Sequence, residues 1–209
     1  MTTGIRVIIT KAGDVSAITT EPMHAVEPAE GEVRIKVAYA GINFADLLMR
    51  LGFYQPRPPF PFTPGYEVSG VVDALGKGVT GLEVGQRVVA AMRTGGQASF
   101  VNAPVDRVIP LPDGFSLQKA AATPVTYMTA HHMLHHLGHL QPDDKVLIHG
   151  GAGGVGTAAL QLCKWAGVSK VWATSSKSKH GSIERYGAHR SAQRGFSGHH
   201  QSGDRRKRR

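Results

Sequence analysis

Residues 149–160, HGGAGGVGTAAL, join an apolar strand-like stretch to an apolar helix-like stretch through a glycine-rich turn. Gly151, Gly153 and Gly156 fit the pattern GxGxxG, which in this context is typical of dinucleotide sites. We expect Gly151 to permit the tight turn, Gly153 to let the backbone approach a pyrophosphate, and Gly156 to let the helix pack on the strand. The helix N-terminus would then face the anion. A glycine turn with a purely structural role is the alternative interpretation.

The residues around the turn have the pattern of an α/β fold. GVGTAALQLCKWAG, 154–167, predicts a helix, and KVWATS, 170–175, predicts a second buried strand. KHGSIERYGA, 179–188, predicts a second helix. With the strand DKVLIHG, 144–150, these stretches give the order βαβα, which begins a parallel sheet.

The end of the second predicted strand indicates which nicotinamide cofactor the turn would prefer. Sites that prefer NADH place an acidic residue about twenty positions after the glycines, where it holds the ribose 2′-hydroxyl. Here residues 174–179 read Thr-Ser-Ser-Lys-Ser-Lys. Hydroxyl and ammonium groups suit a 2′-phosphate, so this stretch favours NADPH. A solvated loop that leads into a capped helix is the alternative.

The first 115 or so residues have the pattern of a β-rich domain. β-Branched and polar residues alternate in short stretches such as EVRIKVAYAGI, 32–42, and YEVSGVVDAL, 66–75. The proline-rich stretch YQPRPPFPFTPG, 54–65, predicts a long irregular loop, and loops of that length usually cover a site. After Ser116, which can cap a helix, the pattern becomes helical, with a break expected at Pro124.

The formal net charge of +9 over 209 residues is concentrated at one end of the chain. Residues 1–176 carry +1, and residues 177–209 carry +8. Residues 191–209 contain one phenylalanine and no aliphatic periodicity, so we expect a disordered basic tail there. Nucleic-acid or acidic-membrane binding by this tail is a minor alternative, because no aromatic residues are interleaved to stack on bases.

The composition otherwise predicts a protein of a reducing compartment. No apolar run approaches the roughly eighteen residues that a membrane span needs, and the first residues enter a strand pattern without a targeting segment. The single cysteine, Cys163, excludes an internal disulfide. We therefore expect a cytoplasmic protein with no membrane span and no specific nucleic-acid partner.

Several stretches resemble the zinc-independent quinone oxidoreductase family of the medium-chain dehydrogenase/reductase superfamily. The first are DDKVLIHGGAGGVGTAALQLCK at 143–164, GINFADLLMRLGFY at 41–54 and PGYEVSGVVDALGKGV at 64–79. TPVTYMTAHHMLHHLGHLQP at 123–142 and SKHGSIERYGAH at 178–189 look most like the branch of the vesicle amine transport protein homologues. The resemblance runs from about residue 5 to residue 190.

The resemblance implies a β-rich GroES-like N-terminal domain at residues 1–122, followed at 123–190 by a partial α/β Rossmann domain, truncated after about two parallel strands. It also implies a reductase that uses NADPH, acts without a metal on a small-molecule quinone or enone, and can form a homodimer. The residues that match the family's active-site cleft are Asn43, Asp46 and Tyr54. Those that match its cofactor contacts are Thr129, Gly151, Ala152, Gly153, Gly154, Val155, Gly156, Ser176 and Lys179.

Two positions bear on whether a metal takes part in the chemistry. Zinc-dependent alcohol dehydrogenases of the superfamily carry a cysteine near position 43 and a histidine where this chain has Tyr66. Neither ligand is present. Without a Lewis acid to polarise a carbonyl, a substrate that is already electrophilic, such as a quinone or enone, is the better candidate.

The histidine-rich stretch HHMLHHLGH, 131–139, is the other place where a metal could bind. It places His131 and His135, and likewise His132 and His136, at a helical spacing that can chelate an ion. No carboxylate of an HExxH motif accompanies them. Incidental clustering is the favoured interpretation, and no metal site is predicted.

The sequence departs from the family pattern at Gln86, where an aspartate is usual, and after Arg190, where a third parallel strand would follow. A dinucleotide fold is built from two βαβαβ halves, so most of the nicotinamide half would be missing. An open sheet edge and an uncovered apolar face predict marginal stability or association. The alternative to an active reductase is a catalytically silent truncated isoform or gene-model fragment that acts at most as a binding module.

Overall fold

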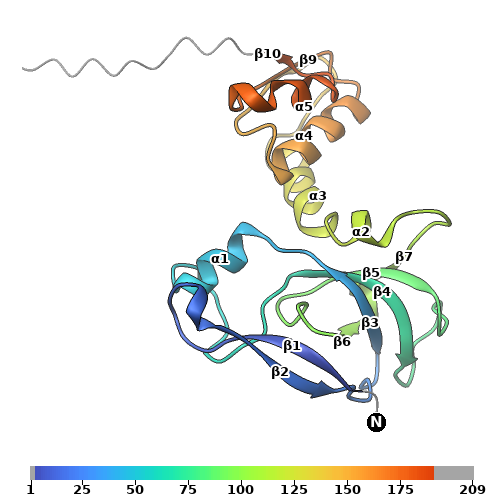
Figure 1. Ribbon diagram of the computed structural model, residues 1–209. Helices are drawn as coiled ribbons and strands as arrows, with labels where there is room; N and C mark the ends of the chain where they lie inside the picture. The colour runs from blue at the N-terminus through green and yellow to red at the C-terminus, as the bar shows by residue number, and fades with distance from the viewer. Residues whose placement is uncertain (1–2, 191–209) are drawn as a thin grey trace, which may run out of the picture. The chain divides into compact units, whose positions relative to one another are not determined.

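The computed structural model describes residues 3–190 (Figure 1), and the predicted basic tail at 191–209 lies outside the described residues. Contacts divide the chain into two compact units, Met1–Thr129 (unit 1) and Ala130–Arg209 (unit 2). The division falls inside helix α3 (Pro124–His131). The predicted domain boundary after residue 122 stays a proposal, because the contacts instead divide the chain after Thr129, inside α3.

Unit 1 is built on a five-stranded antiparallel sheet with the order β6-β3-β4-β5-β7. Alternation along β3 places Val33 and Ile35 in the core, where both are 0% exposed. Figure 1 shows the sheet curling around that core, as expected for the predicted β-rich domain. The strands are β3 (Glu32–Ala40), β4 (Glu67–Leu75), β5 (Arg87–Ala91), β6 (Phe100–Pro104) and β7 (Val108–Pro110), with a 3₁₀ turn at Val105–Arg107 between the last two.

A two-stranded antiparallel ribbon, β1 (Thr3–Ile9) and β2 (Ile18–His24), completes the β structure of unit 1. A 3₁₀ turn at Val15–Ala17 precedes β2. Single bridges join Arg6 to Ala98 and Ile9 to Phe62, so the ribbon is attached to the rest of the unit at two points. A second, smaller core cluster forms at this attachment from Ile9, Met49 and Phe62.

Helix α1 (Phe44–Leu51) begins with a buried carboxylate that serves its N-terminus. Asp46 is 5% exposed, and its Oδ2 accepts a hydrogen bond from the Asn43 backbone N–H (2.8 Å). Its Oδ1 accepts one from the backbone N–H of Gly65 (3.0 Å), a residue whose φ of 110° favours glycine. Asp46 therefore fixes both the start of α1 and the turn before β4.

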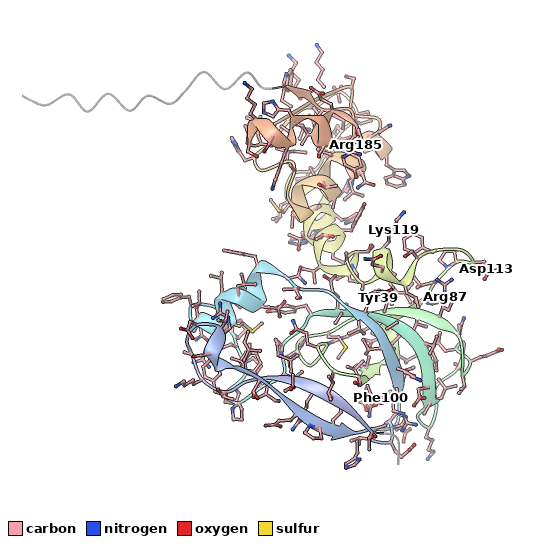
Figure 2. The ribbon with its side chains drawn as sticks, in the orientation of Figure 1. Tyr39, Arg87, Phe100, Asp113, Lys119 and Arg185 are labelled. Atoms are coloured by element: carbon pink, nitrogen blue, oxygen red, sulfur yellow. The ribbon has the colours of Figure 1, made fainter. Side chains whose placement is uncertain are left out.

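Two helices follow the sheet, separated by the break that the sequence predicts at Pro124. The predicted cap at Ser116 is confirmed, since its side chain accepts from the Lys119 backbone N–H at the start of α2 (Leu117–Ala120). The Arg87 side chain on β5 donates to the Phe115 carbonyl and anchors the loop before α2 (Figure 2). After α3 the chain continues as a π-helix, His132–Leu137, which Gly138 ends.

Unit 2 has a parallel sheet with the order β10-β9-β8. Its core contains Leu160 and Cys163 from α4 and Ile183 from α5, with exposures of 1%, 0% and 1%. The predicted βαβα order is confirmed, and a two-residue strand, β10, follows it. The elements are β8 (Lys145–Ile148), α4 (Gly154–Trp165), β9 (Lys170–Ala173), a 3₁₀ turn at Lys177–Lys179, α5 (His180–Glu184) and β10 (His189–Arg190).

Within residues 3–190, no helix combines the length and the apolar composition that crossing a membrane requires.

Gly41→Ala should destabilise unit 1, because an added Cβ would collide with the Glu67 side chain and lie 2.7 Å from the Ala121 carbonyl oxygen. We expect a loss of about 1–3 kcal/mol in the free energy of unfolding, measured by urea denaturation, as for other overpacked sites. Gly181→Ala is the matched control, because nothing lies within 4 Å of the added methyl group. A Gly41→Ala variant as stable as the Gly181→Ala variant would contradict the close approach.

Candidate functional site

The carboxylate of Glu67, 2% exposed, connects the start of α1 with the start of α3 inside unit 1. Its Oε1 accepts a hydrogen bond from the Asn43 side-chain amide (2.8 Å), and its Oε2 accepts one from the Val125 backbone N–H (2.8 Å). Val125 lies in the first turn of α3, where backbone N–H groups have no partner within the helix. Because only the amide nitrogen of Asn43 can donate, Glu67 sets which way that amide faces.

The electrostatics of this connection follow from its burial. Burial has the largest effect on the pKa of Glu67 and raises it, whereas the hydrogen bonds from Val125 and Asn43 lower it. Burial also raises the pKa of Asp46, against the lowering effect of its two backbone hydrogen bonds. The negative charge of Asp46 raises the pKa of Glu67 further. Unit 1 therefore holds two carboxyl groups whose protonated forms are favoured by folding.

A cavity of about 700 Å³ in unit 1 is lined by two phenols, Tyr54 from the proline-rich loop and Tyr66 from the turn before β4. Burial, the nearby Tyr54 and the charge of Asp46 raise the pKa of Tyr66 to about 12. Its hydroxyl stays protonated at neutral pH and can donate a hydrogen bond to a ligand oxygen. The remaining lining includes Arg57, Met92, Arg93 and Thr94.

The three predicted substrate residues lie in unit 1 with different surroundings. Tyr54 lines the cavity, and Asn43 is half-buried against Glu67. Asp46 accepts a hydrogen bond from the Asn43 backbone N–H and acts on Tyr66 through its charge, while backbone amides occupy both of its oxygens. A role in the substrate cleft stays a prediction for all three, and for Asp46 the contacts indicate that any such role is structural positioning.

The glycine turn of unit 2 has the close backbone approaches that the motif predicts, with one change of role. The left-handed residue is Gly150 (φ 68°), one position before the glycine expected to make the tight turn. Gly151 is needed for packing, since a Cβ there would lie 2.6 Å from the Ala173 Cβ on β9. A Cβ on Gly156 would collide with the Gly150 carbonyl oxygen, so this residue allows α4 to approach the turn.

The start of α4 presents backbone N–H groups that could donate hydrogen bonds to an anion. Gly153 is the N-cap residue and has no side chain to bond the first turn. The Gly153 N–H donates to the Gly150 carbonyl (2.9 Å), and the Thr157 N–H donates to the Gly153 carbonyl (2.8 Å). The residues between them have N–H groups that an α-helix leaves unpaired. These are Gly154, Val155 and Gly156, which with Ala152 and Gly153 are five of the predicted cofactor residues.

The carboxyl end of β9 brings hydroxyl and ammonium groups beside this turn. Thr174 Oγ1 accepts a hydrogen bond from the Gly150 N–H (3.2 Å), and the Thr174 carbonyl accepts one from the Gly151 N–H (2.9 Å). Ser176 is the N-cap residue of the 3₁₀ turn at Lys177–Lys179 and makes no side-chain capping bond, and its side chain and that of Lys179 are exposed. Ser176 and Lys179, the residues predicted to contact a 2′-phosphate, therefore lie shortly after β9, whose end is hydrogen-bonded to the glycine turn through Thr174.

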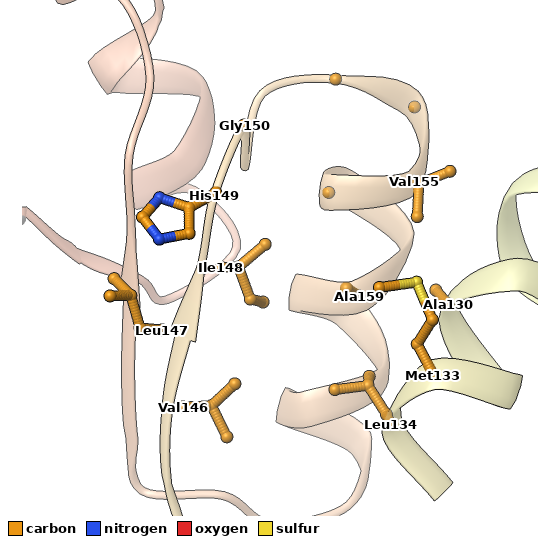
Figure 3. Close-up of a pocket in the computed structure, with 13 residues that line it drawn as sticks. Ala130, Met133, Leu134, Val146, Leu147, Ile148, His149, Gly150, Val155 and Ala159 are labelled. Atoms are coloured by element: carbon orange, nitrogen blue, oxygen red, sulfur yellow. The ribbon is translucent and has the colours of Figure 1, made fainter. Parts of the chain in front are cut away.

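An apolar cavity of about 560 Å³ lies beside the turn (Figure 3). Val146 and Ile148 of β8 face α4 in this view, together with Met133 and Leu134 of the π-helix. His149 lies on the other side of the strand, with its Nδ1 3.3 Å from Thr174 Oγ1. The cavity shares its wall with the first turn of α4, so an apolar group could lie next to an anion held there.

The remaining predicted positions lie on the helices around residue 130. Thr129 is exposed on α3 at the end of unit 1, and its cofactor contact stays a prediction. The rings of each histidine pair lie close together: those of one pair are tilted, with centroids 4.7 Å apart, and those of the other are stacked, with centroids 4.8 Å apart. Among residues 3–190, no three metal-ligating side chains come together. The pairs are His131 with His135 and His132 with His136.

Sequence reasoning gave no site role to the buried Glu67, nor to three residues that line the cavity of unit 1, Tyr66, Arg57 and Arg93. Glu67 was noted as part of a motif, and Tyr66 as a replacement for a metal ligand, but neither was assigned a site role. Arg57 and Arg93 are 36 positions apart in the sequence, and nothing in their local pattern indicates a shared cavity. The one available signal was the length of the proline-rich loop, which predicted a covered site.

Comparison with known proteins gives a family for both parts of the chain. Residues 29–113 match the alcohol dehydrogenase GroES-like domain. The synaptic vesicle membrane protein VAT-1 homolog of Danio rerio is 45% identical over 157 residues, which are 75% of this chain and 32% of the relative. The Rattus norvegicus homolog is 40% identical over 182 residues, 86% of this chain and 45% of the relative. The chain therefore spans between a third and a half of the length of these relatives.

Solved structures agree with this match. The human synaptic vesicle membrane protein VAT-1 homolog-like protein superposes with a TM-score of 0.86 at 36% identity, covering 90% of this chain and 61% of that one. CurK enoyl reductase gives 0.84 at 33%, covering 90% and 58%. A mycobacterial protein complexed with NADPH gives 0.80 at 33%, again covering 90% and 58%. The chain belongs to the medium-chain dehydrogenase/reductase superfamily, with VAT-1 homologues among its relatives.

Proposed function

We propose that the glycine turn of unit 2 binds the diphosphate of NADPH. The observation that carries this proposal is the bare first turn of α4, whose backbone N–H groups are not capped by a side chain. A Cβ on Gly153 would meet only the Gly150 carbonyl oxygen, at 3.3 Å, so the approach to this turn is open at that position. A solved relative with bound NADPH supports the same cofactor.

The preference for NADPH over NADH rests on the end of β9. From Thr174 to Ile183 the chain carries lysines, hydroxyl groups and a histidine, and no carboxylate. The exposed Lys179 and the Ser176 hydroxyl would donate to a 2′-phosphate, whereas a carboxylate would repel it. Ser178 lies beside Ser176, with the two hydroxyl oxygens 3.4 Å apart, so a cluster of donors is available.

We further propose that unit 1 supplies the substrate side of a reductase that acts on quinones or enones. Bound NADPH supplies a hydride to an electrophilic carbon of such a substrate. The chain's contribution is to position the acceptor and to stabilise the charge that develops on its oxygen. Tyr66 donates its phenolic hydrogen to that oxygen, and Tyr54 lines the same cavity beside it. The Asn43 amide is held by Glu67, so its own oxygen has a fixed direction.

Activity of the 209-residue chain separates this proposal from a binding-only role. Purified protein should oxidise NADPH in the presence of 1,4-naphthoquinone, followed at 340 nm, and should bind NADPH in calorimetry. Binding without oxidation would favour a binding module over a reductase. If the protein neither binds nor oxidises NADPH, the cofactor assignment itself is rejected.

Lys179→Gln should weaken NADPH binding about five- to tenfold and leave NADH binding nearly unchanged, because one charge-assisted contact to the 2′-phosphate is removed. Isothermal titration calorimetry with both nucleotides measures the two affinities. Lys170→Gln is the matched control, because Lys170 is exposed at the opposite end of β9. Equal losses for the two nucleotides, or an equal effect of the control, would count against the 2′-phosphate contact.

Glu67→Gln should change how stability depends on pH. Burial raises the pKa of Glu67, so its protonated form favours the folded state, and this contribution is lost as the pH rises through the folded pKa. The free energy of unfolding of the wild-type protein minus that of the variant should therefore be largest at pH 4 and should fall toward pH 8. Urea denaturation at each pH measures both values. Glu83→Gln, at an exposed side chain, is the control. A difference between wild type and Glu67→Gln that stays constant with pH would contradict the assignment.

A further inference from the structure

The cavity that Tyr54 and Tyr66 share in unit 1 also carries two guanidinium groups. Arg57 comes from the proline-rich loop, and Arg93 follows β5. Both side chains line the same volume of about 700 Å³ as the phenols. No carboxylate belongs to the described lining of this cavity. The phenols and the guanidinium groups give it several hydrogen-bond donors, and the guanidinium groups also carry positive charge.

Arg57 is held in place without being neutralised. Its Nη1 donates to the Pro58 carbonyl (3.2 Å), and its guanidinium lies 4.4 Å from the centre of the Phe60 ring. Its Nε is buried and has no hydrogen-bond partner within residues 3–190. A neutral carbonyl and an aromatic ring orient the group but leave its full positive charge available to a ligand.

Arg93 is exposed at the same cavity and is likewise uncompensated. The ion pairs of the described residues are Arg6–Glu21, Arg34–Glu27 and Arg34–Asp73, so neither cavity arginine belongs to one. The acidic group that acts on the cavity is Asp46, through Tyr66. Backbone N–H groups of Asn43 and Gly65 already bond to the Asp46 oxygens. The two arginines are therefore available to pair with an anion from outside the chain.

We propose that this cavity selects acceptors that carry an anionic group, such as a carboxylate or a sulfonate, on the quinone or enone. This inference rests on the proposed reductase function and names the class of its substrate. The phenols would face the carbonyl oxygen, while the planar guanidinium groups of Arg57 and Arg93 would bind the anion. Guanidinium groups match planar carboxylates with paired hydrogen bonds, which a neutral substituent cannot replace.

Binding of naphthalene-2-carboxylate and its neutral analogue naphthalene-2-carboxamide tests the proposal without NADPH. The two ligands share a ring system and differ in charge. We expect the carboxylate to bind about tenfold more tightly by isothermal titration calorimetry in low salt, with the advantage falling as salt is added. Equal affinities for the two ligands would overturn the proposal.

Arginine variants locate the effect in this cavity. Arg93→Gln and Arg57→Gln should each remove most of the preference for the carboxylate, while naphthalene-2-carboxamide binding is retained as evidence that the variants are folded. Arg107→Gln is the matched control, because it makes the same change of charge in the 3₁₀ turn after β6, outside the cavity. A preference that survives in both cavity variants, or that is lost equally in the control, would also overturn the proposal.

Turnover with NADPH gives a second readout, which separates failure of the reductase function from failure of the anionic substrate class. With NADPH, 1,4-naphthoquinone-2-sulfonate should have a KM about tenfold below that of 1,4-naphthoquinone, and Arg93→Gln should erase that ratio. If the protein oxidises no NADPH at all, the reductase function fails, while the naphthalene ligands still decide whether the cavity binds anions. If it reduces both quinones with equal KM values, the reductase function stands and the anionic substrate class is rejected.

Discussion

The carboxylate of Glu67 is the constraint on which the site in unit 1 depends. It has to be buried because β4 enters the core at this residue, and a buried carboxylate is tolerated only when donors satisfy it. The two donors come from the residue before α1 and from the first turn of α3. One side chain therefore ties two helices to the sheet, and Gly41 has no side chain because the carboxylate occupies that space.

The fold was largely predictable because its signals are local. Alternating β-branched residues mark β3 and β4, and the glycines after β8 mark the turn into α4. What failed was finer backbone detail. The left-handed residue of the turn is Gly150 and not Gly151, and Gly151 is needed for a different reason, because Ala173 on the neighbouring strand occupies the space of a side chain there. The π-helix at His132–Leu137 also followed no local signal.

The candidate site was predictable only where one stretch of chain makes it. The backbone amides at the start of α4 are consecutive, so a motif describes them. The cavity of unit 1 instead joins the loop around Arg57 to the end of β5 near Arg93, and a single sequence does not show which loops meet. For Asp46 the family motif names the carboxylate but not its partners, which are the backbone N–H groups of Asn43 and Gly65.

Cys163 gives unit 2 a built-in reporter of its own opening. It is the single cysteine of the chain, it is 0% exposed on α4, and burial raises the pKa of its thiol. Thiol reagents react with exposed thiolates, so labelling of this residue reports the transient separation of α4 from the sheet beneath it. Ligands that bind the first turn of α4 would slow that labelling, and events confined to unit 1 would remain invisible to it.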